Sequence, residues 1–277
     1  RGSCGCPAHM LEDASGVAAD QSDWLRLADL PLNIFLSKAE RKLRDKAFSQ
    51  PLAVADLFKV NVGVKPYQVG KGKPAQTAQV VKDRIFDANT KSGKEYRQYL
   101  RGKDFNRYEI RPLERRYIKY GPWLAEPRPA ANFDAEKKLL VRQTGDEIIA
   151  ALDTEQHLCL NNVHVLEPRD ESVDVYAILA ILNSALSTWC LRSMNPEAGE
   201  ALAEVKKEFV EMLPIPPRST WAQLSKLGRA ITALKAAVPS VVRDRQLRAL
   251  IKQIDLAVFQ AFGLTETEIA HVVGSDH

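Results

Sequence analysis

The feature that most constrains the fold is a stretch, residues 96–166, in which short strand-like segments follow one another without a helical period between them. Connections rich in proline and glycine separate these segments, which lie near residues 98–101, 108–111, 116–119, 138–143, 148–152 and 157–166. Short strands without crossover helices are typical of antiparallel or mixed sheets. With an earlier strand at residues 57–64, the sequence predicts a mixed sheet over residues 57–166.

Helical patterns flank the predicted sheet. Residues 22–46 carry an apolar stripe at a spacing of 3.6 residues, and residues 173–193 are apolar nearly all round, as in a buried helix. Residues 200–212 continue the helical pattern until the proline run 213–217 ends it. We therefore expect a helical lead-in before the sheet and a buried helix packed across it.

A second helical region follows the proline run. Residues 219–238 and 241–262 predict two long helices that pack as an antiparallel hairpin, with Gly263 as the C-cap of the second. Thr265 and Glu268 match a capping box at the start of a short third helix. The predicted fold class is α+β, a mixed or antiparallel sheet with packed helices followed by a C-terminal helical hairpin.

The chain is expected to divide at the proline run. Residues 1–10 match expression-vector sequence and are left out of the fold prediction. Residues 11–217 then form one domain, which holds the helical lead-in, the sheet and the buried helix, and residues 218–277 form the C-terminal helical segment.

The charge is unevenly distributed. The formal net charge of the 277 residues is +4, but residues 61–145 hold 19 Lys and Arg against 9 Asp and Glu. Aromatic side chains interleave with cations over residues 96–129, a pattern that favours nucleic-acid binding. A half-buried sheet with a solvated charged face would show the same pattern.

Several classes of protein are not indicated. No apolar run is long enough to span a membrane and no secretory signal pattern is present, so we expect a cytoplasmic protein without a membrane partner. Cys159 and Cys190 lie in apolar segments, as free core thiols do. No Cys or His pair has the spacing of a zinc site, and a nuclease-like pattern at Asp134 and residues 136–138 has only chance-level spacing. We expect no catalytic residue and no metal site.

Seven motifs occur in order between residues 54 and 216. They span residues 62–67, 70–74, 99–108, 117–121, 123–129, 138–145 and 179–184, and include Tyr99-Leu100-Arg101-Gly102-Lys103-Asp104 and Asn106-Arg107-Tyr108. This series resembles the TaqI-like C-terminal specificity domain, the target-recognition part of adenine-specific DNA methyltransferases and of fused type IIG restriction-modification enzymes.

The resemblance implies a function in bacterial defence. The chain would recognise a sequence in double-stranded DNA for the catalytic methyltransferase domain of the same parent chain, which lies N-terminal to this fragment. The fragment itself would be no enzyme and hold no cofactor, because it has neither an S-adenosylmethionine pocket nor the Asn-Pro-Pro-Tyr or Asp-Pro-Pro-Tyr motif that holds adenine. The parent would use S-adenosylmethionine, and Mg²⁺ if it also cleaves DNA.

The expected DNA contacts are cationic and amide side chains in or beside these motifs. Arginine binds guanine O6 and N7 with two hydrogen bonds and glutamine binds adenine similarly, whereas lysine acts mainly as a point charge. The expected DNA-binding residues are Lys65, Lys71, Lys73, Arg101, Lys103, Arg107, Arg142, Gln143, Thr144, Asn161 and Asn162.

These residues are expected on three elements. The lysines of residues 65–74 would lie on a mobile loop, Arg101, Lys103 and Arg107 would form a cationic ridge, and residues 142–144 would contribute from a later strand. Asp104 is expected to orient Arg101 or Arg107 in an ion pair, and Asn161 and Asn162 form a turn or meet the DNA. If the family motifs are scaffold, the base-reading residues lie in residues 82–95 or 111–116 instead.

Two other functions fit the sequence. The aromatic-rich face and the helical hairpin suit a protein-interaction module or specificity subunit that docks a methyltransferase or nuclease subunit, or an RNA-binding module. A catalytic part of a fused nuclease is the other alternative, which the lack of a metal or nucleophile cluster disfavours.

Overall fold

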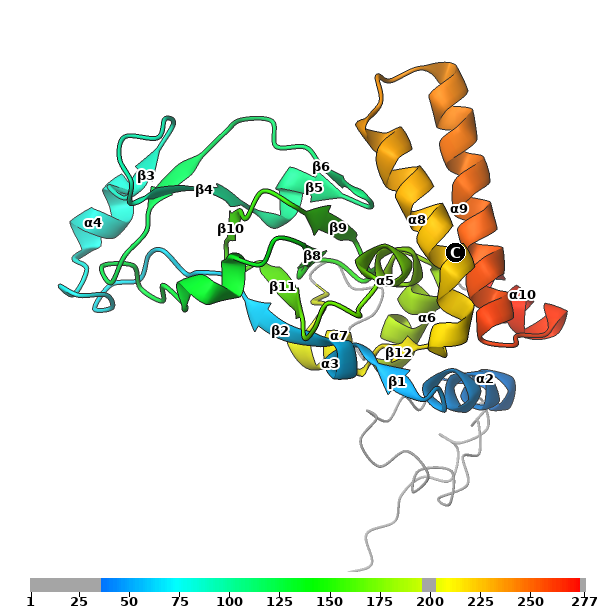
Figure 1. Cartoon of the computed structure of the whole chain (residues 1–277). Coiled ribbons are helices and arrows are strands. Elements are labelled where there is room, and N and C mark those ends of the chain that lie inside the picture. The colour runs from blue at the N-terminus through cyan, green and yellow to red at the C-terminus, as the bar shows by residue number, and fades with distance from the viewer. Residues whose placement is uncertain (1–35, 196–202, 275–277) are drawn as a thin grey trace, which may run out of the picture.

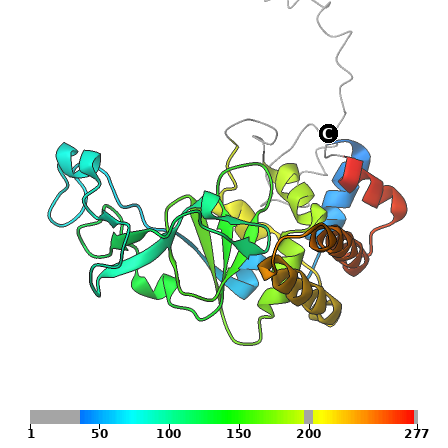
Figure 2. The same ribbon diagram turned by 90° about the horizontal axis from the view of Figure 1, so that it is seen from above.

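The computed structural model describes residues 36–195 and 203–274, and it combines helices with open sheets. The predicted α+β fold class is confirmed. Figures 1 and 2 show three parts in a row: a projecting sheet, a central sheet, and a block of helices that includes a long hairpin. The prediction for residues 1–10 lies outside the described residues, as do residues 22–35 of the helical lead-in predicted over residues 22–46. The described remainder of that lead-in is helical from Lys38 to Phe48.

The central sheet has four antiparallel strands in the order β2–β11–β8–β9. They are β2 (Phe58–Val62), β11 (Val163–Pro168), β8 (Lys138–Arg142) and β9 (Ala150–Asp153). On β8, Leu139 and Val141 point into a core cluster shared with the helices, and Leu140 points into a second cluster on the opposite face. Because side chains alternate along a strand, burial on both faces explains the unbroken apolar run of this strand.

The projecting sheet is mixed. Its strands are β10 (Leu158–Cys159), β4 (Tyr96–Leu100), β7 (Tyr117–Lys119) and β3 (Asp87–Ala88), in that order, and β10 and β4 are parallel. The short helix α4 (Ala78–Asp83) lies at its outer end (Figure 1). The strands predicted over residues 57–166 thus divide between two sheets, which the parallel bridge between Val64 and Leu160 joins.

Two small strand pairs complete the β structure. A hairpin, β5 (Phe105–Asn106) with β6 (Glu109–Ile110), follows a 3-10 turn at Gly102–Asp104. The second pair joins β1 (Leu52–Ala53) to β12 (Pro214–Ile215), so part of the proline run is a strand that pairs with the first strand of the described chain.

The buried helix predicted over residues 173–193 is two helices, α5 (Val175–Leu182) and α6 (Ala185–Met194), bent by 63°. The side-chain amide of Asn183 accepts from Ala150 N and donates to Ala150 O, which fixes it to β9. Ser184 then caps the second helix through its hydroxyl. The prediction of one helix was wrong because a tertiary hydrogen bond of Asn183 interrupts it.

The helix predicted over residues 200–212 is shorter than expected and is α7 (Lys207–Met212). The preceding residues run alongside the end of β8, where Val205 N donates to Gln143 O and Gly145 N donates to Ala203 O. Buried His164 also binds Val205 O, at 2.6 Å. These backbone bonds to residues far away in the sequence replace helical ones.

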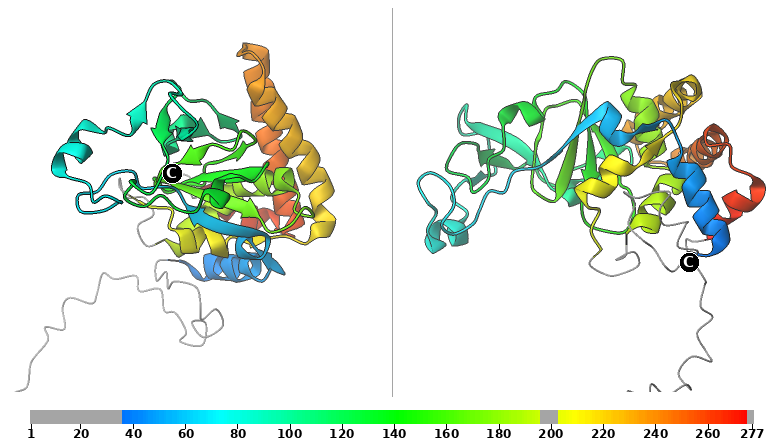
Figure 3. Two further views of the ribbon diagram at one scale, coloured as in Figure 1. Left: turned by 60° about the vertical axis from the view of Figure 1, so that its left-hand side comes forward. Right: turned by 90° about the horizontal axis from the view of Figure 1, so that it is seen from below.

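The C-terminal helices agree with their predictions. They are α8 (Trp221–Ala236) and α9 (Val241–Ala261), an antiparallel pair, and α10 (Glu266–Gly274). Gly263 after α9 has a φ of +64°, and the capping box of Thr265 and Glu268 forms in both directions. α10 lies beside the first described helix, α2 (Lys38–Phe48), where Lys46 donates to Glu268 at 2.7 Å (Figure 3).

One hydrophobic cluster joins the central sheet to the helices on both sides of the proline run. It includes Leu139 of β8 and Ile178 of α5 together with Ile231 of α8 and Val258 of α9. The short helix α3 (Val54–Leu57) packs into the same cluster. The domain boundary at residue 217 stays a prediction.

Cys159 and Cys190 are buried free thiols, as predicted. No single helix in the described ranges is long and apolar enough to cross a membrane. Only the bent pair α5 and α6 together has that length and composition, and its side chains lie in the core.

Candidate nucleic-acid interface

Four cationic side chains from three separate segments meet in one open hollow of about 510 Å³. We call it the arginine hollow, and its lining residues are Arg84, Tyr99, Arg101, Lys103, Arg116, Thr144, Leu160 and Asn162. It lies between the projecting sheet and the turns that follow β8 and β10. Sequence reasoning named Arg101, Lys103, Thr144 and Asn162, and the structure brings these four together.

Arg101 is held by Asp104. The guanidinium donates through Nε and Nη2 to the two carboxylate oxygens, each at 2.9 Å, and Arg101 N donates to the same carboxylate at 2.8 Å. Burial by itself raises the pKa of the Asp104 carboxyl, but these bonds outweigh burial and leave the pKa below its ordinary value. Asp104 is therefore ionised and orients Arg101. The sequence predicted an ion pair of Asp104 with either Arg101 or Arg107, and the structure shows the pair with Arg101.

Arg84 and Arg116 were not among the named site residues, but they come from the two segments, 82–95 and 111–116, that the sequence offered as alternatives. Arg84 follows α4 in a left-handed conformation, pairs with Asp87 at 2.7 Å and lies over the Tyr67 ring at 4.7 Å. Arg116 pairs with Glu114 at 2.6 Å. No local pattern distinguishes these two arginines from their neighbours in the sequence, because strand pairing in the projecting sheet places them.

The remaining polar groups of the arginine hollow belong to Tyr99, Thr144 and Asn162. Tyr99 is 4% exposed, and burial raises the pKa of its hydroxyl, which keeps the group protonated and able to donate. Asn162 Oδ1 accepts from Gly102 N at 3.3 Å. Thr144 lies at the end of β8, where it bridges to Glu204. The hollow thus offers neutral donors and acceptors beside its cations.

Arg107 and Arg142 do not line the arginine hollow. Arg107 donates to Ile148 O, to Glu147 and to Thr188, so the expected ridge of Arg101, Lys103 and Arg107 does not form. Tyr108, the next residue, has a positive φ and a buried ring, so the chain turns toward the core directly after Arg107.

Arg142 has a structural role. Its guanidinium donates to Gly102 O at 2.8 Å and to Phe105 O at 2.6 Å, and also to Asn106. Because these bonds hold the turn at Gly102–Asp104 against β8, Arg142 fixes the wall of the arginine hollow. Gln143 is half-buried beside it, with its backbone bonded to Asn162 and Val205, and Asn161 is exposed on the turn after β10.

The lysine-rich loop is more ordered than predicted. Buried Gln76 donates to Pro66 O and Trp123 O and accepts from Gln68 N, which fixes the loop from inside. Lys71 and Lys73 are exposed on it, and half-buried Lys65 pairs through its backbone with Glu126. None of these lysines lines the arginine hollow, but all belong to the same projecting part of the molecule.

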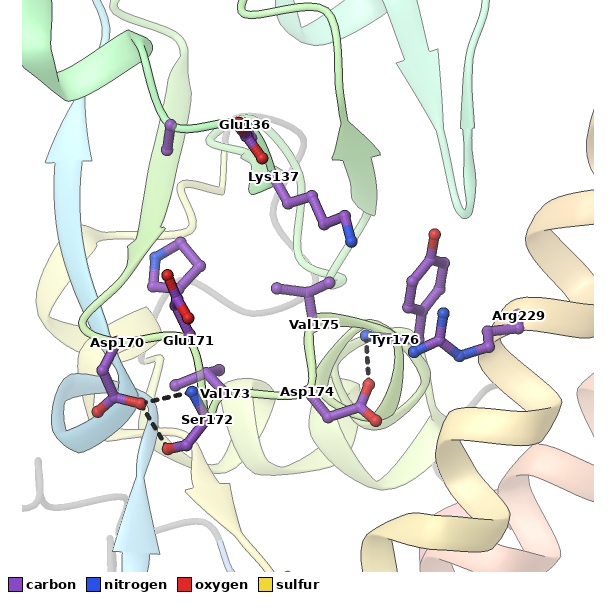
Figure 4. Close-up of a pocket in the computed structure, with 12 residues that line it drawn as sticks. Glu136, Lys137, Asp170, Glu171, Ser172, Val173, Asp174, Val175, Tyr176 and Arg229 are labelled. Atoms are coloured by element: carbon purple, nitrogen blue, oxygen red, sulfur yellow. Dashed lines mark hydrogen bonds between the residues drawn. The ribbon is translucent and has the colours of Figure 1, made fainter.

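A second hollow, of about 590 Å³, lies beside the N-terminus of α5 (Figure 4). Its acidic side chains include Glu136, Asp170, Glu171 and Asp174, and only Lys137 and Arg229 are cationic. Asp170 accepts from Ser172 and Asp174 caps α5, so these carboxylates stabilise the loop and the helix. This charge disfavours binding of a phosphate.

Within the described ranges, no group of three or more His, Cys, Asp and Glu side chains could hold a metal ion. Lys138, the lysine of the nuclease-like pattern, is fully buried, and its ammonium binds Asp153 at 2.5 Å. It is therefore not accessible to a substrate.

The family model of the TaqI-like C-terminal specificity domain matches residues 97–215. Among solved structures, the type IIL restriction-modification enzyme MmeI in complex with DNA is similar, with a TM-score of 0.55 and 14% identity. The match covers 81% of this chain and 35% of MmeI, so the chain spans about a third of that enzyme.

Two structures of type I restriction-modification proteins are less similar in fold. They are the HsdS subunit from Thermoanaerobacter tengcongensis (TM-score 0.40, 12% identity, 80% of this chain and 49% of that chain) and a structure from a study of type I complex assembly (0.38, 15%, 76% and 45%). No curated protein matches the chain. The resemblance inferred from the seven motifs is confirmed, because residues 97–215 match the model of the TaqI-like C-terminal specificity domain.

Proposed function

We propose that the chain recognises a base sequence in double-stranded DNA through the arginine hollow and the loops beside it. The observation that carries the proposal is the convergence of Arg84, Arg101, Lys103 and Arg116 with Asn162 in one open hollow. Guanidinium and amide groups are the side chains that read base edges. The similar fold of MmeI, whose structure contains DNA, supports the proposal.

Two kinds of contact are expected. Lys71, Lys73 and Lys103 are exposed and have no ion pair in the part of the chain that the structure describes, so they are suited to phosphates. The three arginines of the arginine hollow are each paired with a carboxylate and are suited to base edges. Lys65, Gln143, Thr144 and Asn161 remain proposed contacts at the borders of these two regions.

The parent protein is proposed to be an adenine-specific DNA methyltransferase or a fused type IIG restriction-modification enzyme. Its catalytic domain would bind S-adenosylmethionine, and Mg²⁺ if it cleaves DNA. In that arrangement the specificity domain selects the duplex site and the catalytic domain extrudes and modifies the adenine.

Duplex binding as a function of salt tests the proposal. We expect the affinity of the wild type to fall steeply with salt, and the triple variant Lys71→Gln, Lys73→Gln, Lys103→Gln to bind all duplexes more weakly. Each lost phosphate contact lowers the slope of log affinity against log salt by about one. The matched control is Arg248→Gln, Lys252→Gln, which removes two exposed charges from α9 at the other end of the molecule.

Binding that does not depend on salt, or an equal loss in the α9 control, would contradict the proposal. Selection from a randomised duplex pool then asks whether binding is specific. We expect the selected duplexes to share a single consensus sequence. If no consensus is recovered even when the catalytic domain is present, target recognition is excluded.

A docking function is favoured by a different observation. Val238, Val241 and Val242, at the turn between α8 and α9, are 85%, 84% and 67% exposed. Adjacent exposed apolar side chains mark protein contacts. The variant Val241→Asp, Val242→Asp would then weaken binding to the separately produced catalytic domain without changing DNA binding, and unchanged affinity for that domain would exclude this contact.

A further inference from the structure

Each arginine of the arginine hollow is paired with a carboxylate, but the three pairs differ in burial. The carboxylate side chains of Asp87 and Glu114 are 24% and 67% exposed, whereas that of Asp104 is 4% exposed. Exposed ion pairs are screened and hold their side chains weakly. Of the three, Arg101 is therefore the arginine whose carboxylate partner is almost fully buried, and its guanidinium is the most firmly fixed before any ligand arrives.

The pairing with Asp104 leaves one edge of the Arg101 guanidinium available. A guanidinium has five N–H groups in one plane, and Asp104 takes one from Nε and one from Nη2. The remaining edge, formed by Nη1 and the second N–H of Nη2, carries two parallel donors. This is the edge that binds two adjacent acceptors at once.

The support of this pair extends into the core. Asp104 lies in the turn at Gly102–Asp104, whose Gly102 carbonyl is bound by Arg142 and whose Gly102 N–H is bound by Asn162. Lys103 lies in the same turn but is exposed and has no carboxylate within 4.0 Å in the described ranges. The two neighbouring cations thus differ: Arg101 is held by a buried carboxylate, whereas Lys103 is exposed and has no ion pair within the described ranges.

This difference favours a base over a phosphate at Arg101. A buried carboxylate beside the guanidinium cancels much of its attraction for a phosphate, but it leaves the direction of the two outer N–H groups unchanged. Guanine presents O6 and N7 as two adjacent acceptors in the major groove without a net charge. We propose that Arg101 reads a guanine in the target sequence and that Asp104 is the positioning residue that sets its orientation. The proposal rests on the proposed function, since it names a base that the arginine hollow contacts.

The experiment selects binding sites from a randomised duplex pool with the full chain and its variants. We expect Arg101→Gln to lose the preference for one G·C pair by about 5- to 150-fold, with the preferences at other positions retained. The matched control Lys103→Gln removes a charge two residues away, and it should weaken all duplexes equally and keep the wild-type consensus.

Asp104→Asn separates a positioning role from a merely structural one. It removes a negative charge from the arginine hollow, so binding to non-cognate duplexes should stay the same or strengthen while the preference for that G·C pair falls. A variant that has only unfolded would lose all binding, and thermal unfolding of each variant is measured alongside. A lowered guanine preference with retained non-cognate binding supports the positioning role.

The outcomes distinguish this inference from the proposed function. If Arg101→Gln keeps the wild-type consensus, or weakens every duplex equally and lowers the salt slope by about one, Arg101 contacts a phosphate or no DNA at all, and the inference is overturned while target recognition stands. If the wild type itself yields no consensus, the proposed function fails.

Discussion

At the scale of single residues, the most unusual group is a buried cluster on the central sheet. Lys138 and Asp153 are fully buried and their charged groups lie 2.5 Å apart, and His157 binds the other Asp153 oxygen at 2.9 Å. Lys138 also donates to Phe133 O. A buried charge is tolerated only when it is paired and hydrogen-bonded, so each member of the cluster depends on the others.

Replacing Asp153 should therefore destabilise the protein strongly. Asp153→Asn leaves the Lys138 ammonium buried without a counter-charge, and we expect a loss of about 3–5 kcal/mol in the free energy of unfolding. Denaturant titration measures it. The control is Glu155→Gln, because Glu155 is 77% exposed and lies 3.7 Å from His157, and it should change stability by well under about 1 kcal/mol. If the two variants have equal free energies of unfolding, the buried Lys138 ammonium does not need the Asp153 carboxylate as its counter-charge.

The same carboxylate predicts a dependence of stability on acid. Burial raises the pKa of Asp153, but the bonds from His157 and the charge of Lys138 outweigh it and lower the pKa to about 2. Because the pKa is lower in the folded chain than in the unfolded chain, the carboxylate stabilises the fold above about pH 4. This contribution, on the order of 2 kcal/mol, is lost as the pH falls toward 2. The free energy of unfolding of the wild type, measured from pH 5 to pH 2, should show this loss. If the free energy of unfolding of Asp153→Asn falls as steeply with pH, the loss belongs to other groups.

At the scale of elements, the contact between α8 and α5 depends on one glycine. A Cβ atom at Gly228 would lie 2.2 Å from Tyr176 O, a distance that real side chains do not reach. At Gly228 the two helices therefore approach too closely for a larger side chain to fit without a shift. In the same way, Asn183 decides where α5 ends, because its amide binds the backbone of β9.

Gly228→Ala should destabilise the protein although alanine favours helix formation. The gain in helix propensity is about 1 kcal/mol, whereas displacing a packed helix typically costs about 1–3 kcal/mol. Thermal unfolding of Gly228→Ala is compared with that of Ala233→Gly at an exposed position of the same helix, which loses propensity alone. A higher melting temperature for Gly228→Ala than for the wild type would show that α8 adjusts at little cost.

At the scale of the whole molecule, the projecting sheet and the helical hairpin lie toward opposite ends, with the central sheet between them (Figures 1 and 3). Tyr99 of this sheet lines the arginine hollow. This arrangement leaves the projecting part accessible to a duplex while the hairpin is accessible to another protein domain. The hairpin is also part of the core, because α8 and α9 bury Leu224, Ile231 and Val258 against the rest of the fold.

Removal of the hairpin tests the predicted domain boundary. A chain that ends at Pro217 exposes the side of α5 and α6 that α8 and α9 cover, and we expect it to lose cooperative unfolding or to aggregate. Circular dichroism during thermal unfolding and size-exclusion chromatography report these two results. A truncated chain that unfolds cooperatively as a monomer would establish residues 11–217 as an independent domain.

Much of the fold follows from local sequence patterns. The strands β2, β4, β8 and β11, the hairpin helices and the capping box of Thr265 and Glu268 were predicted because their periodicity and caps lie within a few residues of each other. The helix break at Asn183 and the extended residues 203–205 were not predicted, because their hydrogen bonds join residues far apart along the chain.

The sequence by itself determined the fold class, the family motifs and the concentration of basic charge, since these depend on local spacing and composition. Only the tertiary structure decided which cations act together. It gathered Arg84, Arg101 and Arg116 into one hollow and turned Arg107 and Arg142 onto backbone carbonyls. It also placed Lys138 in the core against Asp153. The physical reason is the same in each case: a charged side chain takes the partner that strand pairing brings near it, and that partner is distant in the sequence.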